Sequence, residues 1–330
     1  MHATYLPPPL WALGVSLLCL WILLSPAVRQ RMLDRPNPRS LHEAPVPRSG
    51  GLAIAAGVAV ATALAPQGLA VTLAAAAALV AVSLADDLFG LPAMVRLAAH
   101  FAAAAAVVAF EVGISEPALL LTWLLAIAWS ANLYNFMDGS DGLAGGMALF
   151  GFAAYALAAH QSGQPQLAAL SMVIGAAAAA FLLVNFPPAR IFMGDAGSIP
   201  LGFLAGALGL VGWHAGAWPL WFPMLVFAPF ACDATLTLVK RALRREKLWQ
   251  AHREHYYQRL VRMGFGHRGT AWIEYAAMAG CALTALVARE AGAAVQLGAV
   301  GAAVLGLIAL ALWIDARWAR HLRESGGARA

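Results

Sequence analysis

The sequence predicts an all-α polytopic membrane protein, and three observations support this fold class. Of the 330 residues, 62% are hydrophobic and only 11% are charged, whereas soluble domains average about 25% charged residues. The apolar residues fall into long runs. The three cysteines lie inside those runs without metal-binding spacing, which argues against a disulfide framework and a thiolate metal site. The composition therefore excludes a soluble enzyme, a disordered chain and a disulfide-rich secreted protein.

Eleven apolar segments approach the roughly 20 residues that a helix needs to cross a bilayer. They are residues 10–27, 50–66, 69–85, 94–112, 117–134, 143–160, 166–184, 197–213, 217–239, 271–288 and 293–314. Pro66 and Gly68 predict a turn between the second and third segments. Pro223 and Pro229 predict that the ninth helix is bent or broken. We expect about eleven transmembrane helices in a single domain, residues 1–330.

The distribution of charge predicts how these helices are oriented. With eleven spans, 20 of the 21 Lys and Arg residues fall on one side, and only Arg289 falls on the other. Because loops rich in Lys and Arg stay in the cytoplasm, we expect the N-terminus outside and the C-terminus inside. The predicted cytoplasmic segments are the loops at about 28–49, 86–93, 135–142, 185–196 and 240–270 and a tail at 315–330. This asymmetry explains the net charge of +5 without a nucleic-acid partner.

Five aspartates lie at the predicted cytoplasmic boundary, although carboxylates are costly near hydrocarbon. They are Asp86, Asp87, Asp138, Asp141 and Asp195. Any one of them could be a solvated loop residue or a helix cap, but five acids from three distant loops share this face. Mg2+ takes one or two carboxylates together with waters and substrate phosphates, and Gly-rich turns expose backbone N–H groups to phosphate.

The same face carries the basic loops and the pair His252 and His255. Phosphoryl transfer requires carboxylates that bind a metal ion and basic side chains that bind anionic oxygens. The residues alone therefore predict a Mg2+-dependent enzyme that acts on a diphosphate at the cytoplasmic membrane surface. A transporter or lipid flippase is the alternative from another class. Transporter sites lie near the bilayer midplane, where the predicted spans carry almost no charge.

Five short motifs occur in one order between residues 36 and 260. They are Pro36–His42 leading to Pro47–Gly51, the pair Asp86–Asp87, the stretch Asn135–Gly142, the stretch Phe192–Ser198, and the loop with His252 and His255. In these residues the chain resembles the polyprenyl-phosphate N-acetylhexosamine-1-phosphate transferases, the superfamily of MraY and WecA. The resemblance implies transfer of a sugar 1-phosphate from a UDP-sugar to undecaprenyl phosphate, with release of UMP and a requirement for Mg2+.

The resemblance also implies roles for individual residues. Asp195 is the expected metal ligand, and Asp86 and Asp87 are the expected pair near the metal and the lipid phosphate. The residues expected to bind substrate are Asn135, Asp138, Asp141, Asn185, Phe192, His252 and His255. Among them, Phe192 is expected to stack on uracil, and the two histidines are expected to face the diphosphate. The implied location is the bacterial inner membrane, and a homodimer in the membrane is compatible with the resemblance.

Two features favour the WecA and WbpL branch over phospho-N-acetylmuramoyl-pentapeptide transferase, which remains the alternative. The last cytoplasmic loop carries fewer histidines, and an eleventh span leaves a basic tail inside. This branch starts O-antigen and related envelope glycans from a UDP-N-acetylhexosamine, and nothing in the sequence selects the sugar. Outside the motifs, Asp233 is expected to face the site; the alternative is that it pairs with groups at the break in the ninth helix. His267 is expected to be a solvated loop residue.

Overall fold

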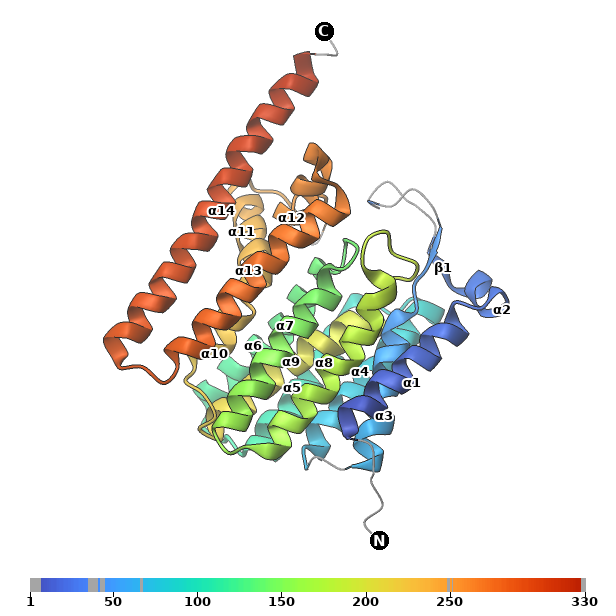
Figure 1. Ribbon diagram of the computed structural model, residues 1–330, viewed down its shortest axis with the longest axis vertical. Coiled ribbons are helices and arrows are strands. Elements are labelled where there is room, and N and C mark those ends of the chain that lie inside the picture. Colours follow the sequence, from blue (N-terminus) through green and yellow to red (C-terminus); the bar gives the residue numbers. More distant parts are fainter. Residues whose placement is uncertain are drawn as a thin grey trace.

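The computed structural model describes residues 7–34, 41, 45–65, 68–247, 250 and 252–327, so most of the predicted motif Pro36–His42 lies outside the described residues. The protein is a bundle of helices (Figure 1). Its α-helices are α1 (Pro8–Leu23), α2 (Pro26–Arg29), α3 (Gly50–Leu64), α4 (Ala70–Phe89), α5 (Ala93–Ala106), α6 (Pro117–Met137), α7 (Leu143–Gln161), α8 (Pro165–Asn185), α9 (Asp195–His214), α10 (Trp221–Val226), α11 (Ala228–Leu243), α12 (Tyr256–Leu260), α13 (Gly266–Ala288) and α14 (Ala293–Gly327).

The remaining elements are short. A 3-10 turn (Gln30–Met32) precedes strand β1 (Leu33–Asp34), and β1 pairs antiparallel with β2 (Val46–Pro47), with Leu33 opposite Pro47. A π-helical turn (Val107–Val112) extends α5, and another (Val261–Phe265) joins α12 to α13. In the residues that the structure describes, the protein is thus all-α apart from this two-stranded sheet.

The helices confirm a multi-pass membrane protein. Within the described part of the chain, eight helical stretches are long and apolar enough to cross a bilayer. They are α4, α5 with its π-turn, α6, α7, α8, α9, the stretch Tyr256–Ala288, and α14. The apolar helices α1 and α3 are shorter, and the ninth predicted segment forms the pair α10 and α11. All eleven apolar segments are therefore helical, while eleven crossings and their direction stay predictions.

Several helices extend beyond the predicted spans, among them α4 and α14. Helix α4 continues to Phe89 and ends at Gly90, whose φ of 66° is the left-handed conformation typical of a residue after a helix. Asp86 and Asp87 therefore lie in the last turns of a helix rather than in a loop. Helix α14 has 35 residues and is about 52 Å long at 1.5 Å per residue. Since no proline or capping signal interrupts it, the predicted tail continues as helix to Gly327.

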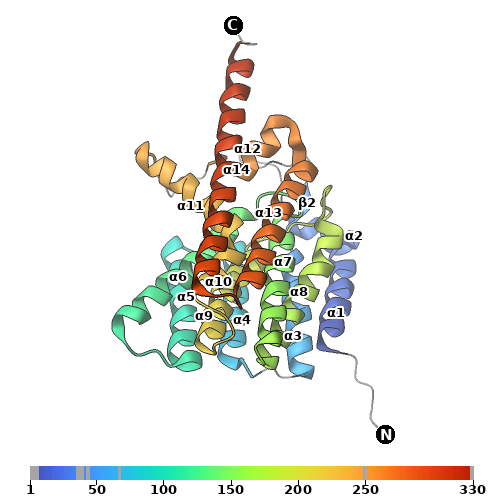
Figure 2. The ribbon, with the colours of Figure 1, turned by 60° about the vertical axis from the view of Figure 1, so that its left-hand side comes forward.

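The predicted break in the ninth segment is confirmed. Helix α10 ends at Val226 and α11 begins at Ala228, with Phe227 between them and Pro223 and Pro229 on either side. Proline removes a backbone donor and clashes with the preceding turn, so these two positions account for the break. Figure 2 shows α11 turning away from the main bundle toward the end where α12 lies.

The bundle is centred on α9. In the most apolar 18-residue stretch of α9, 83% of the residues are buried. In the corresponding stretch of α14, at the periphery, only 17% are buried. Small residues allow this close packing. A Cβ at Gly202 would overlap Tyr134 and the backbone of α6, and the Ser130 hydroxyl donates to the Gly202 carbonyl at 2.8 Å. The first residue of α9, Asp195, is thereby fixed at one end of the most buried helix.

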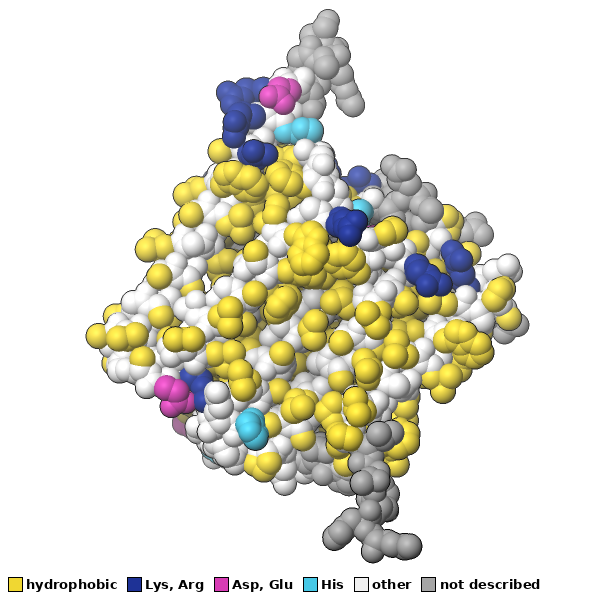
Figure 3. Space-filling model, viewed as in Figure 1, with side chains coloured by type: hydrophobic (Ala, Val, Ile, Leu, Met, Phe, Trp, Pro, Cys, Tyr) yellow, Lys and Arg dark blue, Asp and Glu magenta, His cyan; other side chains and the backbone are white. Residues whose placement is uncertain are grey.

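Helix α1 begins and α14 ends at opposite ends of the bundle (Figure 1). In the view of Figure 3 most Lys and Arg side chains lie toward the end where α14 finishes, above a broad hydrophobic surface.

Arg289, the predicted exception, has a buried side chain that donates to the carbonyls of Ala158 and Ala217 and to the Ser162 hydroxyl at 2.8–3.1 Å. Its position therefore has a structural reason, because it joins three segments of the bundle.

Candidate active site

The site is built where the segment before α3 meets the segment before α9. Arg48 and Phe192 form a parallel bridge, and the Phe192 N–H donates to the Pro47 carbonyl at 2.8 Å. Two residues after Arg48, the Gly50 N–H donates to the Phe192 carbonyl, also at 2.8 Å. This pairing places the Arg48 guanidinium on the Asp195 carboxylate, with which it forms an ion pair. Two residues almost 150 positions apart therefore share one charged centre.

Gly194 makes the ion pair sterically feasible. Its φ of 74° favours glycine, and a Cβ at this position would press on the Arg48 side chain at 2.9 Å. Because Asp195 is the first residue of α9, its carboxylate also lies at the positive end of the helix dipole. Only 12% of the Asp195 side chain is exposed, against 41% of the Arg48 side chain. The centre is thus open to solvent on the arginine side.

Two further carboxylates surround this pair. Although burial acts to lower it, attraction to Asp195, Asp87 and Asp138 raises the pKa of Arg48. Burial raises the pKa of Asp138 to about 8; Arg48 opposes this shift, and Asp195 adds to it. Asp34 also attracts Arg48, so four acids act on one arginine, and burial favours the protonated form of Asp138.

The adjacent aspartates of α4 have different surroundings. The Asp86 carboxylate accepts from the Leu91 N–H at 2.8 Å and from Arg96 Nη1 at 2.7 Å. It thereby holds the turn between α4 and α5. Asp87 is exposed, makes no hydrogen bond within the described residues, and interacts electrostatically with Arg48 and Asp195. Of the two, Asp87 is the one available to a ligand.

The loop after α6 connects this centre to the rest of the site. Asn135 Oδ1 accepts from the Ser198 hydroxyl at 2.7 Å, which ties the end of α6 to the first turn of α9. The Tyr257 hydroxyl donates to the Phe136 carbonyl at 3.2 Å. A side chain at Gly139 would overlap the Tyr257 ring. The glycine is therefore needed for α12 to pack against this loop.

Asn185 and Asp141 hold neighbouring loops together. Asn185 is buried, accepts from the Gly142 N–H at 2.9 Å and donates to the Ile191 carbonyl at 2.9 Å. Asp141 accepts from the Ala189 N–H at 2.9 Å. Both side chains thus position the site, and direct contact of either with substrate stays a prediction.

His267 differs from the expectation of a solvated loop residue. Its Nδ1 lies 2.9 Å from the Ser140 hydroxyl and 3.6 Å from Asp141 Oδ1. The residue lies in the first turn of α13, whose N-terminus packs onto the Asp138–Gly142 loop. Its only signal in the sequence is its position within the last predicted cytoplasmic loop.

The second half of the site is a histidine pair held by Asp233. Asp233 Oδ1 lies 3.1 Å from His255 Nδ1, and the carboxylate accepts from the amides of Tyr256 and Tyr257 at 2.9 Å. Asp233 is therefore a positioning residue that fixes His255 at the start of α12. The rings of His252 and His255 lie 4.8 Å apart. Burial, together with the charge of His255, lowers the pKa of His252 to about 4, so His252 is neutral at pH 7.

Loop 135–142 joins the two halves, because Tyr257 of α12 contacts it and Asp138 belongs to it. Within the described residues no group of three or more His, Cys, Asp and Glu is close enough to hold a metal alone. Mg2+ needs only one or two carboxylates. The excess of acids around Arg48 fits such an ion, with Asp87 as the exposed carboxylate and Asp195 as the carboxylate paired with Arg48.

Comparison with known proteins gives a consistent result. The family model described as glycosyl transferase family 4 matches residues 69–212. A probable undecaprenyl-phosphate N-acetylglucosaminyl 1-phosphate transferase of Bacillus subtilis is 30% identical over 79% of each chain. A decaprenyl-phosphate N-acetylglucosaminephosphotransferase of Mycolicibacterium smegmatis is 30% identical over 76% of this chain and 73% of its own. A phospho-N-acetylmuramoyl-pentapeptide-transferase of Moorella thermoacetica is 42% identical, over only 28% of this chain and 29% of its own.

Proposed function

We propose a reaction for this chain on the premise that it belongs to the polyprenyl-phosphate N-acetylhexosamine-1-phosphate transferases of glycosyl transferase family 4. In this reaction it transfers an N-acetylhexosamine 1-phosphate from a UDP-sugar to undecaprenyl phosphate and releases UMP. The product would start O-antigen or a related envelope glycan, from an active site on the cytoplasmic face of the bacterial inner membrane. The observation that carries the proposal is the meeting of Asp87, Asp138 and Asp195 around Arg48, beside the histidine pair.

The reaction needs little covalent help from the protein. A phosphate monoester has a second pKa near 6, so the lipid phosphate is largely a dianion at neutral pH. One of its oxygens would attack the sugar-bearing β-phosphorus, form the new P–O bond and break the bond to the oxygen that leaves with UMP. Mg2+ would supply charge neutralisation on the diphosphate and the departing UMP.

The residues of this chain would hold and orient the reactants. Asp195 and Asp87 would hold the Mg2+, and Arg48 would face the anionic oxygens. His255, fixed by Asp233, and the neutral His252 would contact the diphosphate from the other side of loop 135–142. Asn135 and Asp141 would support the nucleotide side of the site, and Phe192 would stack on uracil. Such positioning and electrostatic stabilisation account for most of phosphoryl-transfer catalysis.

The test is UMP release by purified protein with undecaprenyl phosphate, with and without Mg2+. UDP-GlcNAc, UDP-GalNAc and UDP-N-acetylmuramoyl-pentapeptide would be compared as donors. We expect release with a UDP-N-acetylhexosamine and Mg2+ only. Asp195→Asn keeps the shape and removes the charge, so turnover should disappear, while Glu324→Gln, which removes an exposed charge on α14, should be active. Release from the pentapeptide donor alone would assign the muramoyl reaction, and no release from any donor would refute the proposal.

A further inference from the structure

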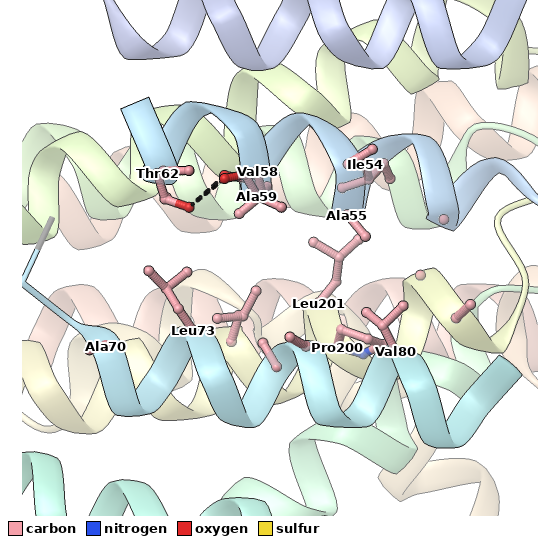
Figure 4. Close-up of a pocket in the computed structure, with 18 of the residues that line it drawn as sticks. Ile54, Ala55, Val58, Ala59, Thr62, Ala70, Leu73, Val80, Pro200 and Leu201 are labelled. Atoms are coloured by element: carbon pink, nitrogen blue, oxygen red, sulfur yellow. Dashed lines mark hydrogen bonds between the residues drawn. The ribbon is translucent and has the colours of Figure 1, made fainter. Parts of the chain in front are cut away.

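Helix α14 lies at the periphery of the bundle (Figure 1) and contacts it closely at one place. In the part of α14 whose burial the structure describes, residues 293–324, Ile314 is the one buried residue, at 1% exposure. The apolar groove of about 690 Å³ in Figure 4 is lined by other elements, namely α3, α4 and α9 with Gly68 between the first two. An effect of α14 on the candidate site therefore has to pass through the elements that meet the helix around Ile314.

A small apolar cluster joins this part of α14 to the histidine segment. Ile314 packs with Tyr256 and Leu260 of α12, and all three side chains are buried. The space left between α11, α12, α13 and α14 is a cavity of about 30 Å³, which has room for one or two water molecules. Asp233, which fixes His255, lines the same cavity. The packing of α14 thus extends to the residues that hold the histidine pair.

One carboxylate of α14 adds charged contacts beside this cluster. Asp315 accepts from Arg259 Nη1 of α12 at 2.8 Å and forms an ion pair with Lys240 of α11. The Tyr256 hydroxyl also donates to Asp315, at 3.3 Å. The Arg259 side chain is only 7% exposed, and a buried charge is stable only when it is paired. Asp315 therefore neutralises a cation that lies inside the contact between α12 and α14.

Aromatic rings continue the contact beyond α12. The Arg262 guanidinium lies 4.7 Å from the centre of the Trp318 ring, and the Arg317 guanidinium lies 5.5 Å from that of Phe265. The rings of Phe265 and Trp313 meet edge-on, with their centres 5.9 Å apart. Helix α14 thus holds both α12 and the π-helical turn that follows it.

Helix α12 transmits this contact to the site because its faces meet different partners. The side chains that meet α14 lie on one face, since positions i, i+3 and i+4 of a helix are neighbours; they are Tyr256, Arg259 and Leu260. Tyr257 points about 100° away from Tyr256, and its hydroxyl donates to the Phe136 carbonyl at 3.2 Å. His255 is the residue that caps the start of the same helix. One short helix therefore connects α14 to loop 135–142 and to the histidine pair.

We propose that Asp315 is a positioning residue of the active site. By holding Arg259 and Lys240 it fixes the outer face of α12, and α12 in turn holds His255 beside loop 135–142. Isolated helices shorter than about 12 residues are marginal in water, so α12, with five residues, depends on such contacts for its position. The inference rests on the proposed function, because that function assigns the histidine pair to the diphosphate.

Substitutions at position 315 separate charge from shape. Asp315→Asn keeps the size of the side chain and removes its charge, so kcat per folded protein should fall at least fivefold, while the KM values for the UDP-sugar and undecaprenyl phosphate stay within twofold. Asp315→Glu keeps the carboxylate and should retain at least half of the wild-type kcat. Glu324→Gln removes an exposed carboxylate from the same helix and should match wild type. Equal kcat in Asp315→Asn and Glu324→Gln, or equal losses in Asp315→Asn and Asp315→Glu, would overturn the proposal.

A double-mutant cycle tests whether Asp315 acts through Arg259. Arg259→Gln alone should also lower kcat at least fivefold. Adding Asp315→Asn to it should lower kcat by less than a further twofold, because residues that act through one contact are not additive. Losses that multiply in the double variant would show that the two residues act separately, and would overturn the proposal.

Hydrogen exchange measures the placement of α12 without turnover. The amides of Tyr256 and Tyr257 donate to Asp233. In the whole protein, the peptide that contains them should exchange at least tenfold faster in Asp315→Asn than in wild type, while peptides of α9 stay unchanged. If Asp315→Asn does not fold, Lys240→Gln removes one of the two cations at Asp315 and should accelerate the same peptide at least threefold.

The exchange result also separates this inference from the proposed function. If wild type releases no UMP from any donor, the proposed function fails while the exchange still decides whether Asp315 holds α12. Unchanged exchange of the α12 peptide in the folded variant would overturn the inference. Faster exchange together with an unchanged kcat in active enzyme would reduce Asp315 to a purely structural contact and equally overturn it.

Discussion

Binding of Mg2+ is predicted to release a proton from Asp138. In the metal-free protein, burial and the neighbouring Asp195 charge raise the pKa of this carboxyl to about 8 despite the attraction of Arg48. A cation bound at Asp195 and Asp87 would favour the ionised form of Asp138. The informative change is Asp138→Asn, which keeps the size and polarity of the side chain and removes its titration.

The size of the effect follows from the pKa. At pH 7 a carboxyl with a pKa of about 8 is about nine-tenths protonated, so about 0.9 proton should leave with each Mg2+ bound; at pH 9 the number falls to about 0.1. Because the metal-free form binds more protons, the affinity for Mg2+ should rise with pH, by up to tenfold per unit below pH 8. The stability of the metal-free protein has the opposite dependence. The raised pKa makes ionisation of Asp138 unfavourable in the folded state, so stability is lost as the pH rises from about 4 to 8.

Isothermal titration calorimetry measures the released protons directly. Mg2+ would be titrated at pH 7 in two buffers of different ionisation enthalpy, and the difference in apparent enthalpy gives the number of protons. Wild type and Glu324→Gln should release about 0.9 proton by the linkage argument, and Asp138→Asn none. Metal binding without proton release in wild type, or equal release from the Asp138→Asn protein, would refute the reasoning.

Four further outcomes are expected. Phe192→Ala should raise the KM for the UDP-sugar about tenfold if stacking on uracil is worth about 1–3 kcal/mol, and an unchanged KM would assign Phe192 to packing. Asp233→Asn should lower kcat at least tenfold with little change in KM and shift the pH profile, because the carboxylate fixes His255; an unchanged profile would contradict this role. His252, whose pKa is lowered to about 4, binds fewer protons folded than unfolded, so stability is lost as the pH falls from about 6.5 to 4. His252→Gln should flatten that loss in thermal unfolding scans. Mass spectrometry of protein incubated with UDP-sugar and Mg2+ alone should show no phosphosugar adduct, and a stable adduct would argue against one-step transfer.

The sequence predicts the fold well because apolar runs of membrane length leave few alternatives to helix. Each predicted segment is helical, and Pro223 and Pro229 mark the break between α10 and α11. Helix ends were harder to predict, because charged residues can continue a helix beyond the hydrocarbon core. Helix α4 passes through Asp86 and Asp87 and stops only at Gly90.

The acids of the site were predicted from their types and positions, but their partners were not. Arg48 lies in a recognised motif, yet its pairing with Asp195 depends on the bridge between Arg48 and Phe192. No periodicity in either segment indicates that contact. The same limit applies to Asp233 and His267, which bind loops that are remote in sequence. Tertiary pairing of short segments, rather than local propensity, decides which predicted residues meet.

The different surroundings of Asp86 and Asp87 follow from helix geometry. Adjacent residues of an α-helix point about 100° apart, since one turn takes 3.6 residues, so two neighbouring carboxylates in α4 cannot face the same ligand equally. Asp86 points to the α4–α5 turn, where Arg96 and the Leu91 amide satisfy it. Asp87 instead interacts electrostatically with the charges of Arg48 and Asp195. A pair that looks equivalent in sequence therefore divides into a residue that shapes the loop and one that is available to a metal or phosphate, because α4 is still helical where the two acids occur.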